Sequence, residues 1–187
     1  MTRSRTLDTV VAVLSVAVVA ILVGGWYALG AVTPTPRTPV GDQPYRLGRT
    51  AGASVTLRAP AGWDRVPTGD FDILKFVDRS GGVLIAELTT GLKDFATAAP
   101  RRLRELQYSH IDAHFTGATS SDAGFAGDIC DATAGARTGT CAVVGRKSLL
   151  VTVLALAPSG GQGADVGAVV RSLRAVPAPR PATEAAK

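Results

Sequence analysis

The sequence has few of the residues from which most catalytic, metal and redox sites are built. Its 187 residues include two cysteines, at positions 130 and 141, and two histidines, which excludes a multi-cysteine zinc site and a C-x-x-C redox motif. No G-x-S-x-G elbow or S-x-x-K pair occurs, and the acidic residues are scattered singly. The glycines near residues 145 and 161 lack the spacing of a P-loop or a dinucleotide fingerprint. The sequence therefore favours a protein that binds rather than catalyses, and it predicts no cofactor.

Aromatic residues and clustered charge are also scarce. Aromatic residues make up 5% of the chain although 46% of it is hydrophobic, so the core has to be built mostly from Val, Leu, Ile and Ala. Residues 45–176 hold 15 Lys and Arg against 12 Asp and Glu, intermixed along the chain, so nucleic acid is not an expected partner. The densest basic run is Arg101, Arg102 and Arg104. It is either the solvated side of a helix or a docking patch for anionic lipid or an acidic partner.

Charge is absent altogether from residues 10–32. A helix of that length crosses the ~30 Å hydrocarbon core of a bilayer. Arg3 and Arg5 precede the run and place residues 1–9 in the cytoplasm, while Trp26 and Tyr27 suit the outer headgroup region. The chain is therefore expected to be a single-pass cell-membrane protein with an extracytoplasmic C-terminal domain. The alternative is a cleaved secretory signal, and the lack of a cysteine near its cleavage site excludes a lipid-modified N-terminus.

The rest of the chain divides by composition into three segments. Residues 33–44 contain four prolines and no apolar periodicity, which predicts an extended stalk. Residues 177–187 are rich in Pro and Ala and predict a disordered tail. Residues 45–176 are left as one domain of ordinary size.

Strand patterns dominate the first half of this domain. Alternation around Val55 and Leu57 predicts a half-buried strand that ends at a turn over residues 60–63. The runs 71–77 and 83–89 flank a glycine-rich turn and predict a hairpin. Apolar residues from Phe95 to Leu106 then follow helical spacing, with Pro100 expected in the first turn of the helix.

The second half of the domain predicts more strands and a closing helix. Residues 108–115 read as a strand, and residues 125–157 as two or three strands broken at Gly135 and at 145–147. Asp165 is suited to cap a short helix whose apolar stripe ends at Leu173. Consecutive hairpins with helices on one side predict an α+β domain, with one antiparallel sheet packed by two helices.

The two cysteines predict a disulfide, which an extracytoplasmic location permits. If the hairpin between them turns on Gly135 and Ala136, Cys130 lies directly opposite Cys141. Directly opposed residues have Cα atoms about 4.5 to 5.5 Å apart, within the range that a disulfide requires. Redox-active or free cysteines are the alternatives, and the spacing is far from that of disulfide exchangers.

A second cluster of interest is His110, Asp112 and His114. Residues two apart in a strand share a face, so the three side chains would project together and could bind zinc or copper. The alternative is that Ile111, Ala113 and Phe115 form the buried face and the polar trio is the solvated side of the same strand.

The order of elements resembles a known type of domain. A strand ending in Pro60, Ala61, Gly62 and Trp63, a hairpin, a helix, further strands and a closing helix over residues 169–173 is similar to the PsbP and MOG type of α+β domain. It also resembles the LpqN-type envelope proteins of actinobacteria, although the lipid-anchor cysteine of that group is missing. The resemblance implies an accessory or binding module on a larger assembly. Trp63 is then either a docking residue or part of the core.

Three functions follow as hypotheses. The first is a membrane-anchored module whose outer domain docks onto a membrane complex or another envelope protein, with the anchor raising the effective concentration. The second is the binding of a small apolar ligand, such as a lipid, between helix and sheet. The third is a metal-binding or hydrolytic protein based on His110 and His114.

Overall fold

The computed structural model describes residues 36–49 and 53–177. The expected cytoplasmic N-terminus (1–9), the expected membrane span (10–32), residues 33–35 of the stalk and residues 178–187 of the tail lie outside this range. Within the described ranges, no helix has the length and apolar character needed to cross a bilayer. The elements are, in chain order, β1 (Thr38–Pro39), β2 (Tyr45–Leu47), β3 (Ser54–Leu57), β4 (Asp64–Val66), β5 (Ile73–Val77), β6 (Val83–Thr90), α2 (Phe95–Tyr108), β7 (Asp112–Asp122), β8 (Phe125–Ala134), β9 (Arg137–Arg146), β10 (Leu149–Pro158), α3 (Val166–Arg171) and β11 (Arg174–Val176).

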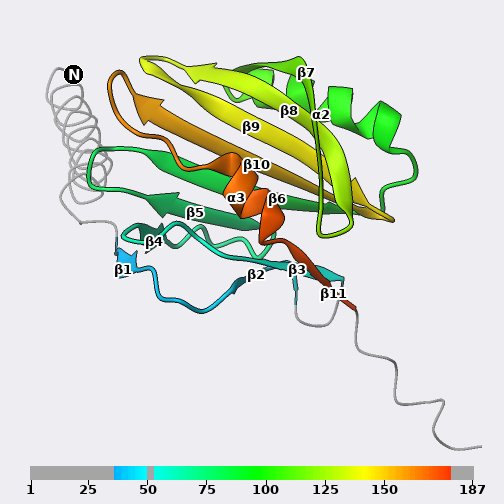
Figure 1. Ribbon diagram of the computed structural model, residues 1–187, viewed down its shortest axis with the longest axis horizontal. Helices are drawn as coiled ribbons and strands as arrows, with labels where there is room; N and C mark the ends of the chain where they lie inside the picture. Colours follow the sequence, from blue (N-terminus) through cyan, green and yellow to red (C-terminus); the bar gives the residue numbers. More distant parts are fainter. Residues whose placement is uncertain (1–35, 50–52, 178–187) are drawn as a thin grey trace, which may run out of the picture. The chain divides into compact units, whose positions relative to one another are not determined.

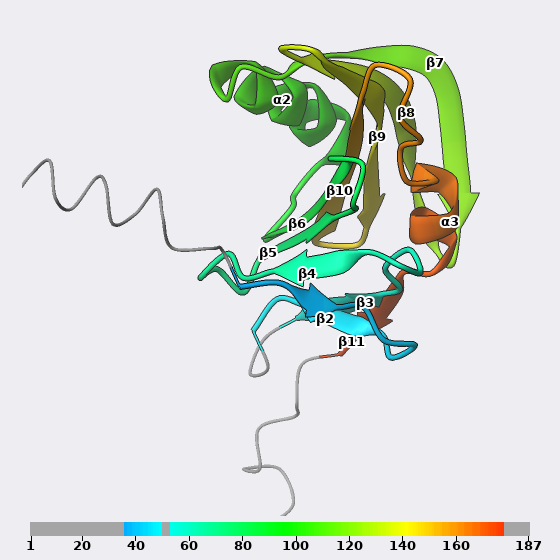
Figure 2. The same cartoon turned by 90° about the vertical axis from the view of Figure 1, so that its left-hand side faces the viewer.

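Two antiparallel sheets form the framework of the domain (Figure 1). The large sheet has eight strands in the order β1-β4-β5-β6-β10-β9-β8-β7, and the small sheet has three in the order β11-β3-β2. Helix α2 lies on one face of the large sheet, whereas α3 and the small sheet lie on the other (Figure 2). The α+β class and the antiparallel sheet are therefore confirmed. The small sheet was not predicted, and the expectation that both helices lie on one side of the sheet was wrong, because α3 packs into the core between the two sheets.

The first core lies between the two sheets. Phe76, Leu84 and Val153 from the large sheet meet Val55 and Leu57 from the small one, and each of them is fully buried. Helix α3 adds Val166, Val169 and Val170 to this core, and Asp165 caps the helix by accepting from the N–H of Ala168 as predicted.

The second core lies under α2. Ala99, Leu103 and Leu106 of the helix pack on strand residues that include Leu150 and Leu154. The helix begins at Phe95 because the Asp94 carboxylate accepts from the N–H groups of Ala96 and Thr97. Pro100 is therefore in the second turn rather than the first, so the expectation for this residue was wrong. There its missing N–H removes the hydrogen bond that the carbonyl of Ala96 would otherwise accept.

Two predicted boundaries also differ from the structure. Thr38 and Pro39 pair with β4, and the N–H of Val40 donates to the carbonyl of Trp63 at 2.8 Å, so this part of the expected stalk belongs to the folded domain. Residues up to Tyr108 continue α2, and β7 begins only at Asp112, because the N–H groups of Ser109 and Ile111 both donate to the carbonyl of Leu106 and close the end of the helix.

Candidate protein-binding surface

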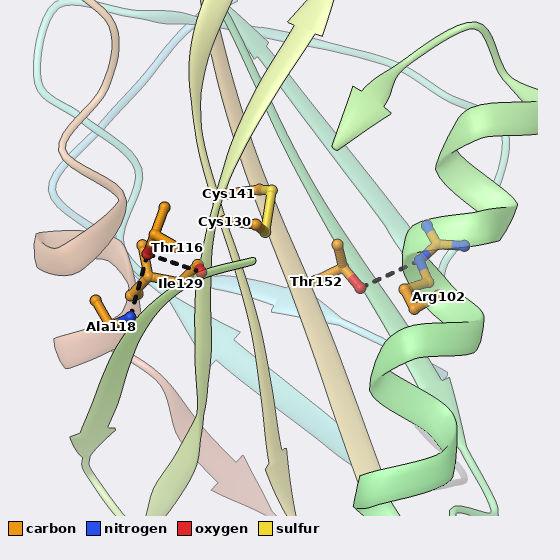
Figure 3. The surroundings of a disulfide bond; sticks show 7 residues. All are labelled: Arg102, Thr116, Ala118, Ile129, Cys130, Cys141 and Thr152. Carbon is orange, nitrogen blue, oxygen red and sulfur yellow. Dashed lines mark hydrogen bonds between the residues drawn. A yellow bond between two sulfur atoms is a disulfide. The ribbon is translucent and has the colours of Figure 1, made fainter. Parts of the chain in front are cut away.

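The disulfide has the predicted register. Strands β8 and β9 pair Cys130 with Cys141 and Ala134 with Arg137, which leaves Gly135 and Ala136 as the turn. Gly135 has φ +59°, a conformation that glycine adopts without strain. The two cysteines are joined, their Cα atoms are 4.8 Å apart, and both side chains are buried in the core under α2 (Figure 3). The bond therefore fastens β8 to β9 on the helix-bearing face of the large sheet.

The neighbouring strand β7 carries a bulge beside the disulfide. Its register to β8 shifts between Phe115 and Thr119. Within the bulge, the Thr116 hydroxyl donates to the carbonyl of Ile129 and accepts from the N–H of Ala118, each at 3.2 Å (Figure 3). These bonds satisfy backbone groups that the shifted ladder leaves unpaired.

The expected metal site is not assembled. Asp112 and His114 lie on the exposed side of β7, but His110 precedes the strand and has φ +59°, so it does not follow the strand alternation. Among residues 36–49 and 53–177, no three His, Cys, Asp or Glu side chains are grouped so that they could hold a metal ion. The alternation held for Ala113, which is buried, and for the half-buried Ile111 and Phe115.

The expected docking residues divide between core and surface. Trp63 is 8% exposed and belongs to the first core, so its role is packing rather than docking. Arg101 and Arg104 are exposed on α2, and Arg101 forms an ion pair with Glu105 at 3.4 Å. Arg102 points the other way, toward the sheet, so the three arginines do not form one patch.

Arg102 joins α2 to the middle of the large sheet. Its guanidinium pairs with Glu87 of β6, and its Nε donates to the Thr152 hydroxyl of β10 at 3.2 Å (Figure 3). A further ion pair, 3.1 Å long, links it to Glu105. The Arg102 side chain is only 12% exposed, so these bonds are shielded from water and fix where the helix lies across the sheet.

Beyond Glu87 no described residue covers the helix-bearing face of the sheet. We call this area the open strip, and it consists of Val66, Ile73, Val77, Val83 and Ile85 on β4, β5 and β6. The strand register places these residues on the α2 side, since Ile85 pairs with Leu154 and Val83 with Leu156, both in the core under α2. All five are half-buried and belong to neither core. Figure 2 shows α2 at the end of the sheet away from β4 and β5.

A hollow of about 530 Å³ lies beside α2, near the end of β6. Its lining includes Lys93, Asp94, Arg101 and Glu105. The Asp94 carboxylate caps the helix by accepting hydrogen bonds from the hydroxyl and the N–H of Thr97. These bonds lower the pKa of Asp94, and the bond from the hydroxyl has the larger effect. The lining also includes Leu92, Ala98 and Leu150, so the hollow has both charged and apolar walls. The space directly between helix and sheet, where the second hypothesis placed an apolar ligand, is filled by the side chains of the second core.

A second carboxylate with a shifted pKa lies in the β5–β6 hairpin. Burial by itself raises the pKa of Asp78, but hydrogen bonds from the Ser80 hydroxyl and the N–H of Gly82 outweigh it, and the net pKa is lowered. These bonds close the turn that the glycines of residues 81–82 predicted. Asp78 therefore has a structural role at one end of the open strip.

Comparisons with known proteins find similarity in fold. No family model matches the sequence, and no curated protein matches it either. The chain is similar to the solution structure of cyanobacterial PsbP (CyanoP) from Synechocystis sp. PCC 6803, with a TM-score of 0.47 and 14% identity over 78% of this chain and 95% of that one. It is also similar to a crystal structure from Bacteroides thetaiotaomicron, with a TM-score of 0.42 and 11% identity over 65% of this chain. The match spans less than half of that chain, namely 45%. A PsbP is thus among the structures that this chain resembles, as the sequence predicted.

Proposed function

We propose that residues 36–177 form an extracytoplasmic module that binds another protein of the cell envelope through the open strip. The strip is the observation on which the proposal depends. Five β-branched side chains surround Lys75 on one side of three neighbouring strands, while the same face is covered by α2 on the other side of Glu87. Lys75 lies at the centre of the strip, between Val66 and Ile85, and Glu87 lies at its border. A partly exposed apolar area that contains a few charged residues is typical of a protein-protein contact.

The disulfide supports the extracytoplasmic location. Disulfides persist in oxidising compartments, and Cys130 and Cys141 are the only cysteines of the chain. Residues 10–32, expected to span the membrane, would tether the domain near a membrane-bound partner. Tethering raises the effective concentration, so a contact of modest area suffices.

Binding rather than catalysis is supported by the roles of the charged residues near α2. Asp94 caps the helix, Arg101 pairs with Glu105, and Arg102 is saturated by Glu87 and Thr152. Each of these groups is engaged by a partner within the domain, and Arg101 and Arg102 share Glu105. A general acid or base would instead need a free group aimed at a substrate.

The proposal is tested by substitution on the strip. A tagged full-length chain is extracted from its native membrane in mild detergent, and partners recovered in stoichiometric amounts are compared with those of Ile85→Lys and Val83→Lys. We expect both variants to lose the partner, since each lysine replaces an apolar contact residue and adds a second positive charge to that of Lys75. Thr133→Lys, on an exposed position of β8, is the matched control and should retain it. A chain that remains monomeric under crosslinking, or Ile85→Lys with its partner intact, would rule the proposal out.

A further inference from the structure

Four arginines gather on the outer face of the small sheet and the adjoining helix, and we call this area the arginine face. Arg46 on β2 and Arg174 on β11 each pair with Thr56 of β3, so the three residues form a row across the sheet. Arg58 follows β3 two residues after Thr56, and Arg171 is in the last turn of α3. All four arginines are exposed. They are spread from residue 46 to residue 174, so only the fold brings them together.

Three of these arginines surround one hollow of about 490 Å³. Arg58, Arg171 and Arg174 line it together with Thr56 and Ser172. The N–H of Arg58 donates to the Ser172 hydroxyl at 2.9 Å, which joins β3 to the end of α3. The Arg174 guanidinium donates to the carbonyls of Arg171 and Leu173 at 2.9 and 2.7 Å, so its position is fixed by the backbone.

Acidic residues balance this charge only in part. Asp165 forms an ion pair with Arg171 at 3.5 Å, with both side chains more than half exposed. Asp42 shares a neighbouring hollow with Arg58. Four cations therefore face two carboxylates, and exposed ion pairs of this kind exchange readily with other anions. Guanidinium groups bind phosphate oxygens through paired N–H donors, so the chemistry of the face suits phosphate.

We propose that the arginine face binds the phosphate headgroups of an anionic bilayer. The cations are all exposed and spread over a sheet surface, which matches a charged plane better than a single enclosed anion. The sequence supplies the proximity, since only residues 33–37 separate the expected span from β1. Five residues reach at most about 18 Å, so a span through residues 10–32 would keep the domain near the headgroups. The open strip lies on the opposite side of the large sheet and remains free for a protein partner.

The test is hydrogen exchange of the full-length chain in two bilayers. The chain is reconstituted into phosphatidylcholine alone and into a mixture of phosphatidylcholine and phosphatidylglycerol. We expect amide exchange in residues 44–58 and 168–176 to be at least about threefold slower in the anionic bilayer, and the difference to vanish in high salt, which screens exposed charges. Equal exchange in the two bilayers would overturn the proposal.

Matched variants show whether the slowing depends on the arginine face or on other cationic residues of the domain. Within the described residues, the side chains of Arg46 and Arg58 make no hydrogen bond or ion pair, so Arg46→Gln with Arg58→Gln leaves the fold intact, which circular dichroism checks. This double variant should lose the slowing, whereas Arg101→Gln with Arg104→Gln on α2 should retain it. Slowing that persists in the first variant contradicts the proposal. Slowing produced by inorganic phosphate in phosphatidylcholine alone would also overturn it, in favour of a site for free anions.

Discussion

The two halves of the helix-bearing face of the large sheet contain similar apolar residues but differ in burial. Under α2, Leu150, Leu154 and Val143 are fully or nearly fully buried. On β5 and β6, Ile73 and Ile85 lie on the same face and remain half-buried. The Arg102–Glu87 pair marks the border between them. Side-chain type therefore does not decide which half is covered; within residues 36–49 and 53–177, the length and placement of α2 do.

This difference supports the proposed role of the uncovered half. A strand with one solvated face normally alternates apolar and polar residues. In β5 and β6 both faces carry apolar residues, and Lys75 and Glu87 are the charged exceptions on the open side. Apolar residues on both faces are typical of a strand that is covered on both sides. Among the described residues α2 does not reach this area, and the proposed partner would cover it.

The largest expected effect comes from truncating a side chain in the covered half. Leu103→Ala should lower the free energy of unfolding by about 2 to 5 kcal/mol, because it leaves a cavity between helix and sheet. Ile85→Ala on the open strip should cost less than about 2 kcal/mol, because the residue is only half-buried. Urea denaturation of both variants, followed by circular dichroism, makes the comparison. Equal losses would mean that the strip is as much a core as the covered half.

Removing the disulfide is expected to have the next largest effect. Replacing Cys130 and Cys141 by alanine frees a loop of about a dozen residues, which in the chain-entropy model costs a little under about 3 kcal/mol. The loss should be confined to β8 and β9. Amide exchange rates in β5 and β6 should therefore be the same in the variant as in the wild type. A uniform acceleration across the large sheet would show that the two halves do not unfold separately.

The border between the halves should respond to Arg102. Arg102→Ala should cost about 1 to 3 kcal/mol, because it removes shielded bonds to Glu87 and Thr152. Arg101→Ala, one position away but exposed, should change stability by less than about 0.5 kcal/mol. A double-mutant cycle with Glu87→Gln measures the coupling directly. Additive losses would contradict the role given to this pair.

The smallest expected effect is a pH dependence at the start of α2. Hydrogen bonds from Thr97 hold the pKa of Asp94 below its unfolded value in the folded protein. The stabilising contribution is therefore complete above the unfolded value, about pH 4, and is lost as the pH falls through the lower folded value. Asp94→Asn retains a cap without a titrating group, so it should flatten this dependence. Parallel acid titrations of the two proteins by circular dichroism provide the check. Identical curves would contradict the claim that Asp94 causes this pH dependence.

Local features of the fold could be predicted from the sequence, and contacts between distant segments could not. The Cys130–Cys141 register followed from one turn residue, Gly135, and the α3 cap from Asp165, because hairpins and caps depend on neighbours in the chain. The small sheet pairs residues near 46, 56 and 174, a relation that no local pattern encodes. The same is true of the arginine face.

The open strip could have been predicted from one pattern in the sequence. Residues 73–77 and 83–88 are apolar on both faces, which is unusual for a sheet with one helix layer. In contrast, no residue pattern near His110 predicts the left-handed backbone that keeps it off the strand that carries His114. The direction of Arg102 is also a consequence of packing, since its neighbours Arg101 and Arg104 face solvent on the same helix.

Site-specific photo-crosslinking in the native membrane tests the central claim most directly. A photoreactive amino acid is placed at Ile85 on the open strip and, separately, at Thr133 on β8. We predict that position 85 gives one discrete crosslinked protein partner and that position 133 gives none. Crosslinks from both positions alike, or from position 133 alone, would contradict the assignment of the open strip as the protein-binding surface.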